Sequence, residues 1–460
     1  MRQSSTHSDG SKVLKFRPID DFSESLINVT NACSETIQPM GVDQICAGLV
    51  RRMQSRPGDS LVCKAIDLRK AYKNLPISEE SLDDAYIAVF SPKDGVPQAF
   101  QSLVLPFGAR ASVMGFCRTS YATWRIAVVI FGLHWTVYFD DYFLVAEVHE
   151  SRHVDMAQQL LFQILGWETS DEKEGGFGPV SRILGVQIDL ADAHLGAAVI
   201  SNVESRVREL VSTIDDVLSP GHLSAAEMRV LRGRLVFAEA QIFGRLTGAH
   251  MRQLSWYEGV VGDAHVDQEL RRSLIFLRDH VLRGEPRKVL SDVVQVFHLY
   301  TDASFESGAG GLGGILFDGE GKMLSFFSEM LSPSGVNMLN PDGKKGMIFE
   351  PETLAVAIGV TQLLPNFAVR PCDRIVVFLD NESSLARLVS ASGSLSADNW
   401  LFEVVFQWEL SVRAVCWYER VASHSNVADA PSRGKCEDLE ASLRINVDPI
   451  AFIRDRSSNV

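Results

Sequence analysis

Carboxylates recur at the ends of strand-like runs in the first half of the chain, which has 460 residues. Asp67 ends an apolar run that starts at Leu61, and Asp140 and Asp141 lie between two further apolar runs. Adjacent acids repel each other, so such a pair on a strand needs compensation. Bound cations would supply it, because carboxylates from two neighbouring strands can hold two Mg²⁺ ions for phosphoryl transfer. Taken alone, the pair also fits a plain hairpin turn.

A Pro/Gly turn, Leu105-Pro-Phe107-Gly108, lies between these acidic segments and precedes an apolar helical pattern. Glycine lets the backbone approach a ligand closely, so this turn could contact a nucleotide base or a template. Further upstream, Lys15 and Arg17 form a basic segment. Arginine binds phosphate through two parallel hydrogen bonds, which favours a triphosphate contact here.

A second group of acids lies between residues 302 and 429. Asp302 and Asp380 follow strand-like runs, whereas Glu352 and Asp429 begin helical patterns. Acids at such positions can converge on one pair of metal ions, which would hydrolyse a phosphodiester by activating water. Glu350 competes with Glu352 for the second position. Each acid taken singly also fits a cap or a turn.

Three motifs of the first group carry a family resemblance. They are Asp67-x-x-x-Ala-Tyr72, Leu105-Pro-Phe-Gly108 with Ser112, and Tyr138-Phe-Asp-Asp141. In this order they resemble consecutive motifs of the reverse transcriptase palm. Residues 183–186 resemble the primer grip, residues 166–173 the loop before it, and residues 232–238 the thumb of long-terminal-repeat and related retroelements. The resemblance covers roughly residues 12–260.

This resemblance implies an RNA-directed DNA polymerase with a right-hand fold of fingers, palm and thumb. Asp67, Asp140 and Asp141 would be catalytic and would hold two Mg²⁺ or Mn²⁺ ions. Tyr72 would stand against the sugar and exclude a 2′-hydroxyl by steric clash, which selects deoxynucleoside triphosphates. An ordinary core aromatic is the alternative for Tyr72. The implied substrate-binding residues are Lys15, Arg17, Tyr72, Phe107, Gly108 and Lys173.

The second group of acids resembles an RNase H domain over about residues 296–435. The matching acids are Asp302, Glu352, Asp380 and Asp429, and His424 matches a histidine that helps product release in that family. The run from Ser423 to Arg433 resembles the DIRS-type and hepadnaviral forms more than the retroviral form. The resemblance implies a mixed-sheet domain that uses two Mg²⁺ or Mn²⁺ ions to cut the RNA strand of RNA–DNA hybrids. In this run, Asn426 and Ser432 are interpreted as structural turn residues without a chemical role.

Nucleic acid would be bound by a local basic surface, because the formal net charge of the chain is −14. Between Met228 and Arg252 there are five arginines and a single acid, Glu239. Helices with that balance could follow a phosphate backbone, although a solvated charged face fits the charges equally. The arginines are Arg229, Arg232, Arg234, Arg245 and Arg252. The expected partners are an RNA template, a DNA primer, the RNA–DNA hybrid and deoxynucleoside triphosphates.

The composition is that of a globular protein, with 46% hydrophobic and 22% charged residues. The longest apolar run, residues 126–133, is too short to span a membrane. The polar start of the chain carries no secretory signal, and the seven scattered cysteines form no CxxC pair. We therefore expect a reduced, intracellular protein of the cytoplasm or nucleus, without membrane association.

Changes of pattern along the chain predict a multidomain α/β and α+β protein. The predicted parts are partial fingers at 1–60, the palm with the remaining fingers at 61–200, a helical thumb or connector at 201–290, an RNase H-like domain at 293–435 and a tail at 436–460. The tail has no clear pattern. Ser224, three residues before Glu227, predicts a capping box at a helix start.

Two short motifs are rejected as sites. His149-Glu-Ser-Arg-His153 has the HExxH spacing of zinc peptidases, but it directly follows the acidic hairpin at a polar helix start. Gly308-Ala-Gly-Gly-Leu-Gly313 has the GxGxxG spacing of dinucleotide sites, but a strand-like run follows it where that site needs a helix. We predict a glycine-rich hairpin there.

Two other functions are weighed against the polymerase. A truncated or domesticated retroelement copy would bind nucleic acid without polymerising. The start of the chain close to Arg17 and the negative charge favour this alternative, whereas the seven acids expected to bind metal favour an active enzyme. A polymerase that makes RNA is disfavoured by Tyr72 and by the RNase H-like segment.

Overall fold

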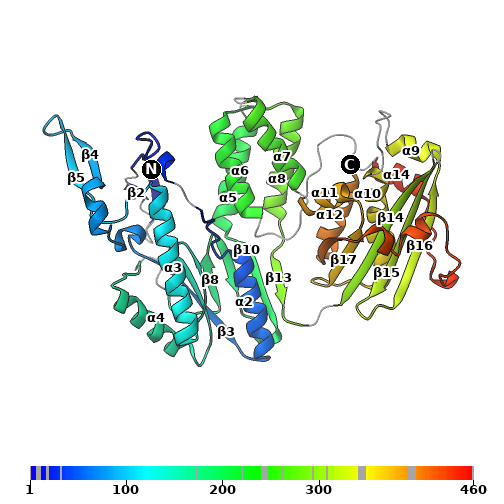
Figure 1. Cartoon of the computed structure of the whole chain (residues 1–460), viewed down its shortest axis with the longest axis horizontal. Helices are drawn as coiled ribbons and strands as arrows, with labels where there is room; N and C mark the ends of the chain where they lie inside the picture. The colour runs from blue at the N-terminus through cyan, green and yellow to red at the C-terminus, as the bar shows by residue number, and fades with distance from the viewer. Residues whose placement is uncertain are drawn as a thin grey trace. The chain divides into compact units, whose positions relative to one another are not determined.

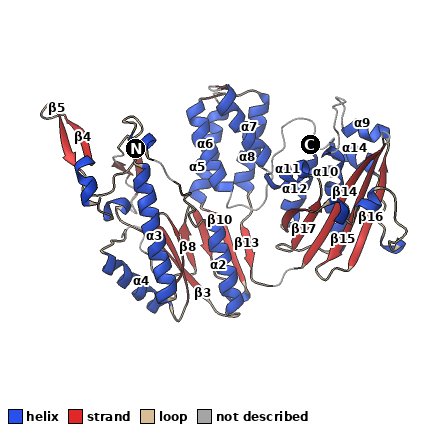
Figure 2. Ribbon diagram, in the orientation of Figure 1, coloured by secondary structure: helices blue, strands red, loops and turns tan. Residues whose placement is uncertain are grey.

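The computed structural model describes residues 2–6, 12–16, 20–31, 34–170, 175–219, 221–239, 247–261, 264–292, 295–306, 309–339, 349–390 and 400–457. The chain divides into two compact units, Met1–Ala198 and Val199–Val460. Both contain helices and strands, so this is a mixed α/β protein with several sheets, as predicted (Figures 1 and 2). Among the described helices, none is both long and apolar enough to cross a membrane.

The first unit is built around a three-stranded antiparallel sheet. Its strands are β3 (Leu61–Asp67), β7 (Asp141–Glu147) and β6 (His134–Tyr138), in the order β3-β7-β6. The central strand β7 is buried from Tyr142 to Glu147. Contacts join β6 to α2 (Val42–Ser55) and α3 (Arg110–Phe131), and join β7 to α4 (Ser151–Leu165). Aromatic side chains fill the core between these elements, among them Phe116, Trp135, Tyr142 and Phe162.

Smaller elements surround this sheet. Three hairpins pair β1 (Arg2–Thr6) with β2 (Lys12–Phe16), β4 (Tyr86–Ser91) with β5 (Val96–Gln101), and β8 (Val180–Ile183) with β9 (Val186–Asp189). The run from Ile183 to Val186 forms the turn of the third hairpin, where Leu184 and Gly185 have positive φ. Further short pieces are α1 (Ile27–Thr30) and 3₁₀ turns at Ala71–Asn74, Glu79–Asp84 and Ala193–Leu195. Strand β10 (Ala197–Asn202) crosses the boundary between the units.

The second unit begins with helices, as the sequence pattern predicts for this segment. They are α5 (Glu204–Leu218), α6 (Ala225–Glu239), α7 (Gly248–Trp256) and α8 (Gln268–Arg283), and they share one apolar core. The capping box at the start of α6 is confirmed, because the Ser224 N–H donates to Glu227 at 3.0 Å and the Glu227 N–H donates to the Ser224 hydroxyl at 3.3 Å. Short strands β11 (His222–Leu223) and β12 (Ala264–His265) lie between these helices and pair with each other, and β13 (Arg287–Leu290) follows α8.

The rest of the second unit is a mixed five-stranded sheet with the order β16-β15-β14-β17-β18. Strands β14 (Val296–Glu306), β15 (Ala309–Asp318) and β16 (Met323–Leu331) are antiparallel, whereas β17 (Arg374–Leu379) and β18 (Val415–Arg420) run parallel to β14. The apolar α10 (Phe349–Ile358) packs on β14 and β15 and also contacts α12 (Trp400–Val412). Further helices are α9 (Pro333–Leu339), α11 (Glu382–Ser390) and α13 (Asp429–Ser432).

The structure decides two sequence interpretations in this part of the chain. From residue 309 onward the glycine-rich run lies in β15 and precedes no helix, so the dinucleotide motif is rejected, as predicted. The tail, where the sequence shows no clear pattern, contains α14 (Pro449–Ser457). Phe452 and Ile453 of this helix are buried in the core beside the sheet. Two adjacent apolar residues do not show the repeated spacing of an amphipathic helix, so the sequence pattern did not predict this helix.

Candidate active sites

The first group of acids meets at one end of the β3-β7-β6 sheet. Asp67, the last residue of β3, lies opposite Asp141, the first residue of β7. Asp140 lies with Phe139 in the turn between β6 and β7, where Phe139 has a positive φ of 54°. The Ser120 hydroxyl of α3 donates to the Phe139 carbonyl at 2.7 Å and so holds the turn. The strand register therefore brings all three acids to the same edge.

The side chains of these aspartates are half-buried. Within the described ranges, two sets of three side chains have all their ligand atoms within 4.8 Å of one another, and Asp67, Asp140 and Asp141 are not one of them. Burial raises the pKa of Cys117 to about 11, and the charge of Asp140 adds to the shift. Asp140 therefore acts electrostatically on the neighbouring α3. Its role as a metal ligand stays a prediction.

Tyr72 forms an aromatic wall near these acids. Its ring lies 4.8 Å from that of Phe107, edge to face, and 4.8 Å from that of Phe116. Burial raises the pKa of Tyr72 to about 12, with smaller contributions from Cys117 and Asp140. The ring is therefore neutral and fixed between the Pro/Gly turn and α3. The structure thus brings Tyr72 and Phe107 together, two residues that the sequence motifs singled out separately.

The Pro/Gly turn is held by a residue that sequence reasoning missed. The Asn28 side chain donates from Nδ2 to the Gly108 carbonyl at 2.9 Å and accepts from the Arg110 N–H at 2.8 Å. Gly108 has a φ of 103°, a value that favours glycine. Asn28 thus clamps both sides of Ala109, the residue before α3. Nothing in the local sequence pattern marks this asparagine, because asparagine is common in loops.

The second group of acids gathers tightly. Ligand atoms of Asp302, Glu352 and Asp380 all lie within 4.8 Å of one another. Asp302 comes from β14, Glu352 from the first turn of α10, and Asp380 directly follows β17. Asp302 and Glu352 are buried, whereas Glu350 is half-buried and lies outside this set. The two neighbouring parallel strands and the helix start thus bring three predicted acids together.

The electrostatics of this cluster disfavour three negative charges. Burial, and then the charges of Asp302 and Asp380, raise the pKa of Glu352 to about 9. Burial also raises the pKa of Asp302 to about 6, with Asp380 and Asp429 adding to the shift and a Ser432 hydrogen bond opposing it. Within the described residues, Glu352 Oε2 is buried without a hydrogen-bond partner. An orphaned carboxylate oxygen beside two further acids fits a hard divalent cation such as Mg²⁺ or Mn²⁺.

The fourth predicted acid, Asp429, is not part of this set of three, although its charge acts on Asp302. It lies on the short helix α13, which packs against β15. A Cβ atom on Gly311 would come within 1.8 Å of the Ser432 carbonyl oxygen, and one on Gly313 within 2.4 Å of the Ser432 nitrogen. The glycines predicted as a hairpin therefore make room for the helix that carries Asp429. Arg433 lies 3.0 Å from the Asp429 carboxylate. His424 is exposed on a 3₁₀ turn, Ser423–Ser425.

Two buried residues beside Asp302 differ from their sequence interpretation. Asn426 donates from Nδ2 to Asp302 Oδ1 at 3.3 Å and to the Thr301 carbonyl at 3.0 Å. The Ser432 hydroxyl donates to Asp302 Oδ2. The sequence marked both as structural turn residues, and they do shape the turn, but they also hold the Asp302 carboxylate at both oxygens.

Three of the predicted nucleic-acid-binding arginines have acidic partners that the local sequence did not reveal. Arg229 and Arg232 both pair with Glu258 at 2.8 Å, and Arg234 pairs with Glu209 at 3.0 Å. Arg252 is half-buried, and burial is the main cause of its lowered pKa. The predicted residues Arg17, Lys173 and Arg245 lie outside the described residues, and only the backbone of Lys15 is described.

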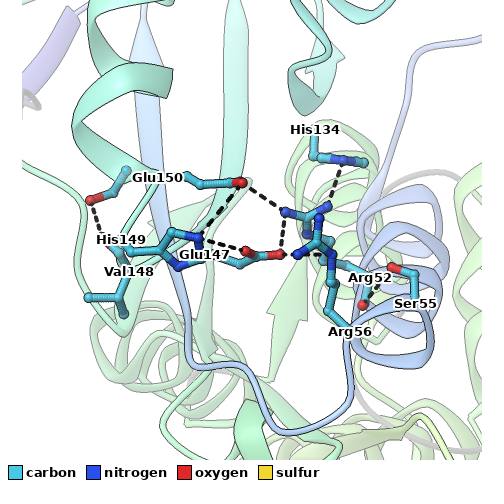
Figure 3. Close-up of polar contacts among 9 residues, drawn as sticks. Arg52, Ser55, Arg56, His134, Glu147, Val148, His149 and Glu150 are labelled. Atoms are coloured by element: carbon cyan, nitrogen blue, oxygen red, sulfur yellow. Dashed lines mark hydrogen bonds and ion pairs between the residues drawn. The ribbon is translucent and has the colours of Figure 1, made fainter.

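A separate charged cluster lies at the opposite end of β7 from Asp141 (Figure 3). The buried Glu147 carboxylate lies 2.6 Å from Arg52 of α2, which also contacts Glu150 at 3.2 Å and His134 at 3.1 Å. His149 lies 3.5 Å from Glu147. Glu147, His149 and Glu150 form the second set with ligand atoms within 4.8 Å. The Arg52 guanidinium already compensates their charge, so the cluster joins α2 to the sheet.

The HExxH motif contributes part of this cluster but not a zinc site. Helix α4 begins at Ser151, so His149 precedes the helix while His153 lies in its first turn. The two imidazoles therefore do not project from consecutive turns of one helix, which is the arrangement that the motif requires. This agrees with the rejection of the motif from sequence.

Comparison of the chain with protein-family models and with curated proteins gives no match. Solved structures of the foamy viral protease-reverse transcriptase are similar to it. One complex with double-stranded DNA, of the form denoted dRH, has a TM-score of 0.45 at 14% identity, covering 90% of this chain and 64% of that one. A complex with an RNA/DNA hybrid has a TM-score of 0.45 at 16% identity, covering 93% and 51%. This chain thus spans less than two thirds of the length of either.

Proposed function

We propose that this chain is a retroelement reverse transcriptase, an RNA-directed DNA polymerase with a linked ribonuclease H that degrades the RNA strand of RNA–DNA hybrids. The observation that carries the proposal is the cluster of Asp302, Glu352 and Asp380, whose ligand atoms lie within 4.8 Å. In the same chain, Asp67 and Asp141 face each other at the end of another sheet. Two carboxylate groups on separate sheets suit two separate reactions at phosphorus.

In this interpretation the parts of the chain take the names of a right-hand polymerase. The β3-β7-β6 sheet with α3 and α4 is the palm, and the β4-β5 hairpin belongs to the fingers. Helices α5 to α8 are the thumb. The five-stranded sheet with its helices is the ribonuclease H domain, of the form resembling DIRS-type or hepadnaviral elements.

At the first site, Asp67, Asp140 and Asp141 would hold two Mg²⁺ or Mn²⁺ ions, for which carboxylate oxygens are suitable ligands. When bound, these ions supply the charge that activates a primer 3′-hydroxyl and stabilises the leaving pyrophosphate. Tyr72 and Phe107 pack edge to face and present a wall to the sugar that excludes a 2′-hydroxyl. The remaining triphosphate and base contacts are Lys15, Arg17, Lys173 and the Gly108 backbone.

At the second site, Asp302, Glu352, Asp380 and Asp429 would hold two such ions, which activate water for attack on the RNA phosphodiester. Glu352 must lose a proton to become a ligand, because its pKa is raised to about 9 by burial and by neighbouring acids. The exposed position of His424 suits a role in product release. Polymerisation leaves an RNA–DNA hybrid, so the second activity acts on the product of the first.

A cleavage assay tests the ribonuclease assignment without the polymerase. The substrate is an end-labelled RNA annealed to DNA, incubated with Mg²⁺ and no nucleotides. We expect the wild-type chain and Glu350→Gln to shorten the RNA, whereas Glu352→Gln, which keeps the volume but removes a ligand, leaves the RNA intact. Equal shortening by all three proteins would contradict the assignment of Glu352.

A second candidate is a retroelement-derived protein that binds and cuts hybrids without extending primers. It is favoured by one observation: the ligand atoms of Asp67, Asp140 and Asp141 are not among the described sets gathered within 4.8 Å. Hybrid cleavage with no primer extension, on any template and with either Mg²⁺ or Mn²⁺, would support this candidate over the first.

A further inference from the structure

The Ser432 hydroxyl contacts the carboxylate of one predicted metal ligand and the backbone of another. It donates to Asp302 Oδ2 and lies 2.9 Å from the backbone carbonyl of Asp429. Ser432 is fully buried, so no water competes for these contacts. A hydroxyl carries one proton and can donate to one acceptor at a time. Its two acceptors therefore compete for the same proton.

The Asp302 carboxylate has little rotational freedom. Asn426 Nδ2 lies 3.3 Å from Oδ1, while Ser432 donates to Oδ2. Asn426 is itself fixed, because it also donates to the Thr301 carbonyl at 3.0 Å and accepts from the Ala428 N–H at 3.2 Å. These donors offset part of the repulsion that Asp302 experiences from the acids around it.

We propose that Ser432 is a positioning residue for the divalent cation at the second site. It holds Asp302 Oδ2 in the orientation that receives the cation. When Oδ2 becomes a ligand, the hydroxyl can turn its proton to the Asp429 carbonyl instead. One side chain thus contacts the carboxylate of Asp302 in β14 and the backbone of Asp429 in α13. This inference rests on the proposed ribonuclease site and adds to it a residue outside the four acids.

The surroundings of Ser432 allow this role to be separated from a structural one. The Ser304 hydroxyl donates to the Ser432 carbonyl at 2.8 Å, and the Ser328 hydroxyl donates to the Pro431 carbonyl at 2.7 Å. Both bonds fasten α13 to the sheet through its backbone and touch no acid side chain. Ser304→Ala and Ser328→Ala are therefore matched controls, since each removes a hydroxyl that bonds the α13 backbone, half-buried at Ser304 and buried at Ser328.

The test is Mn²⁺ binding by calorimetry to the full chain carrying Asp140→Asn and Asp141→Asn, which weaken the first site. We expect Ser432→Ala in this background to bind Mn²⁺ roughly 10-fold more weakly, as is usual when a group that orients a metal ligand is removed. Ser304→Ala and Ser328→Ala should bind as the parent does. If the alanine variant does not fold, Ser432→Cys retains the volume with a weaker donor and should also bind more weakly.

The cleavage of a labelled hybrid gives an independent readout. Ser432→Ala should need more Mg²⁺ for half-maximal rate than either control, and should approach the parent rate at saturating Mg²⁺. Parent-like Mn²⁺ affinity and Mg²⁺ dependence in the Ser432 variants would overturn this inference alone. Failure of the parent itself to cut the hybrid would instead contradict the proposed function.

Discussion

Glu352 shows how the surroundings of a single side chain determine its charge. Burial is the largest cause of its raised pKa of about 9, and Asp302 and Asp380 add to it. At neutral pH and without a cation this carboxyl is therefore mostly protonated. The folded state then binds this proton more tightly than the unfolded state, in which the pKa returns to the ordinary value of 4.5.

The raised pKa predicts a pH dependence of stability in the absence of metal. The contribution of Glu352 is fully present below pH 4.5 and is lost as the pH rises through about 9. We expect thermal melting in chelator to show wild type losing a few kcal/mol across this range, while Glu352→Gln loses less. Glu350→Gln is the control and should follow wild type. Parallel curves for wild type and Glu352→Gln would refute the assigned burial.

Asn28 gives a second prediction at the residue scale. Asn28→Ala removes both hydrogen bonds that clamp the turn bearing Phe107, so the wall formed with Tyr72 should loosen. In primer extension we expect the preference for deoxy- over ribonucleotides to fall roughly 10-fold, with Tyr72→Val as the positive control. Asn31→Ala is the matched control, because Asn31 bonds only the Ile27 carbonyl among the described contacts. An unchanged preference in Asn28→Ala would exclude the clamp.

The acids could be predicted from sequence, but their supporting residues could not. Glu352 lies at a helix start and Asp380 directly follows a strand, positions that the local pattern defines. Asp302 was expected to follow a strand-like run, but it lies inside β14, which continues to Glu306. Asn28 and Ser432 act through partners 80 and 130 residues away along the chain. No local period or spacing encodes such a contact, and both residue types are ordinary in loops.

At the scale of elements, the close approach of α13 and β15 positions Asp429. Gly311→Ala would bring a Cβ atom to 1.8 Å from the Ser432 carbonyl oxygen. The Ser432 carbonyl belongs to the backbone and cannot move aside as the end of a flexible side chain could. We therefore expect the substitution to lower the stability by about 1–3 kcal/mol and to cause a strong loss of hybrid cleavage.

Gly319→Ala is the control for this substitution, since its Cβ would lie 3.4 Å from the nearest atoms. It should melt and cut hybrids nearly as wild type does. Chemical denaturation and the cleavage assay measure both effects. A Gly311→Ala protein with normal cleavage would show that the position of α13 does not depend on its close approach to β15 at Gly311.

Helices α5 to α8 give a prediction that separates a nucleic-acid groove from a solvated face. Glu258 neutralises Arg229 and Arg232, each at 2.8 Å. If these arginines contact phosphates, Glu258→Gln releases them, and hybrid affinity should rise roughly 3- to 10-fold with a steeper salt dependence. Glu269→Gln removes the same charge from α8, where Glu269 bonds Gln253 and, among the described residues, no arginine. Equal effects of both substitutions would favour a general charge effect over a groove.

Elements with a strong apolar period were predictable, and those defined by tertiary packing were not. The mixed α/β class and the capping box at Ser224 follow from local pattern. The helix α14 does not, because only Phe452 and Ile453 enter the core. Likewise, the sequence shows an arginine-rich segment, but the acids that pair with it lie on other helices.

At the scale of the whole molecule, the two carboxylate groups belong to different units. Asp67, Asp140 and Asp141 lie in Met1–Ala198, whereas Asp302, Glu352 and Asp380 lie in Val199–Val460. The sequence predicted two sites because each has its own set of motifs. We therefore expect the two activities to be independent at the chemical step, so that loss of one leaves the other.

The most direct measurement follows both strands in one reaction. A labelled DNA primer on a differently labelled RNA template is incubated with Mg²⁺ and deoxynucleoside triphosphates. We predict that wild type extends the primer and cuts the template, that Asp140→Asn abolishes extension but still cuts the hybrid, and that Asp302→Asn abolishes cutting but still extends. Loss of both activities in either single variant, or binding of the hybrid by wild type with neither activity, would contradict the account.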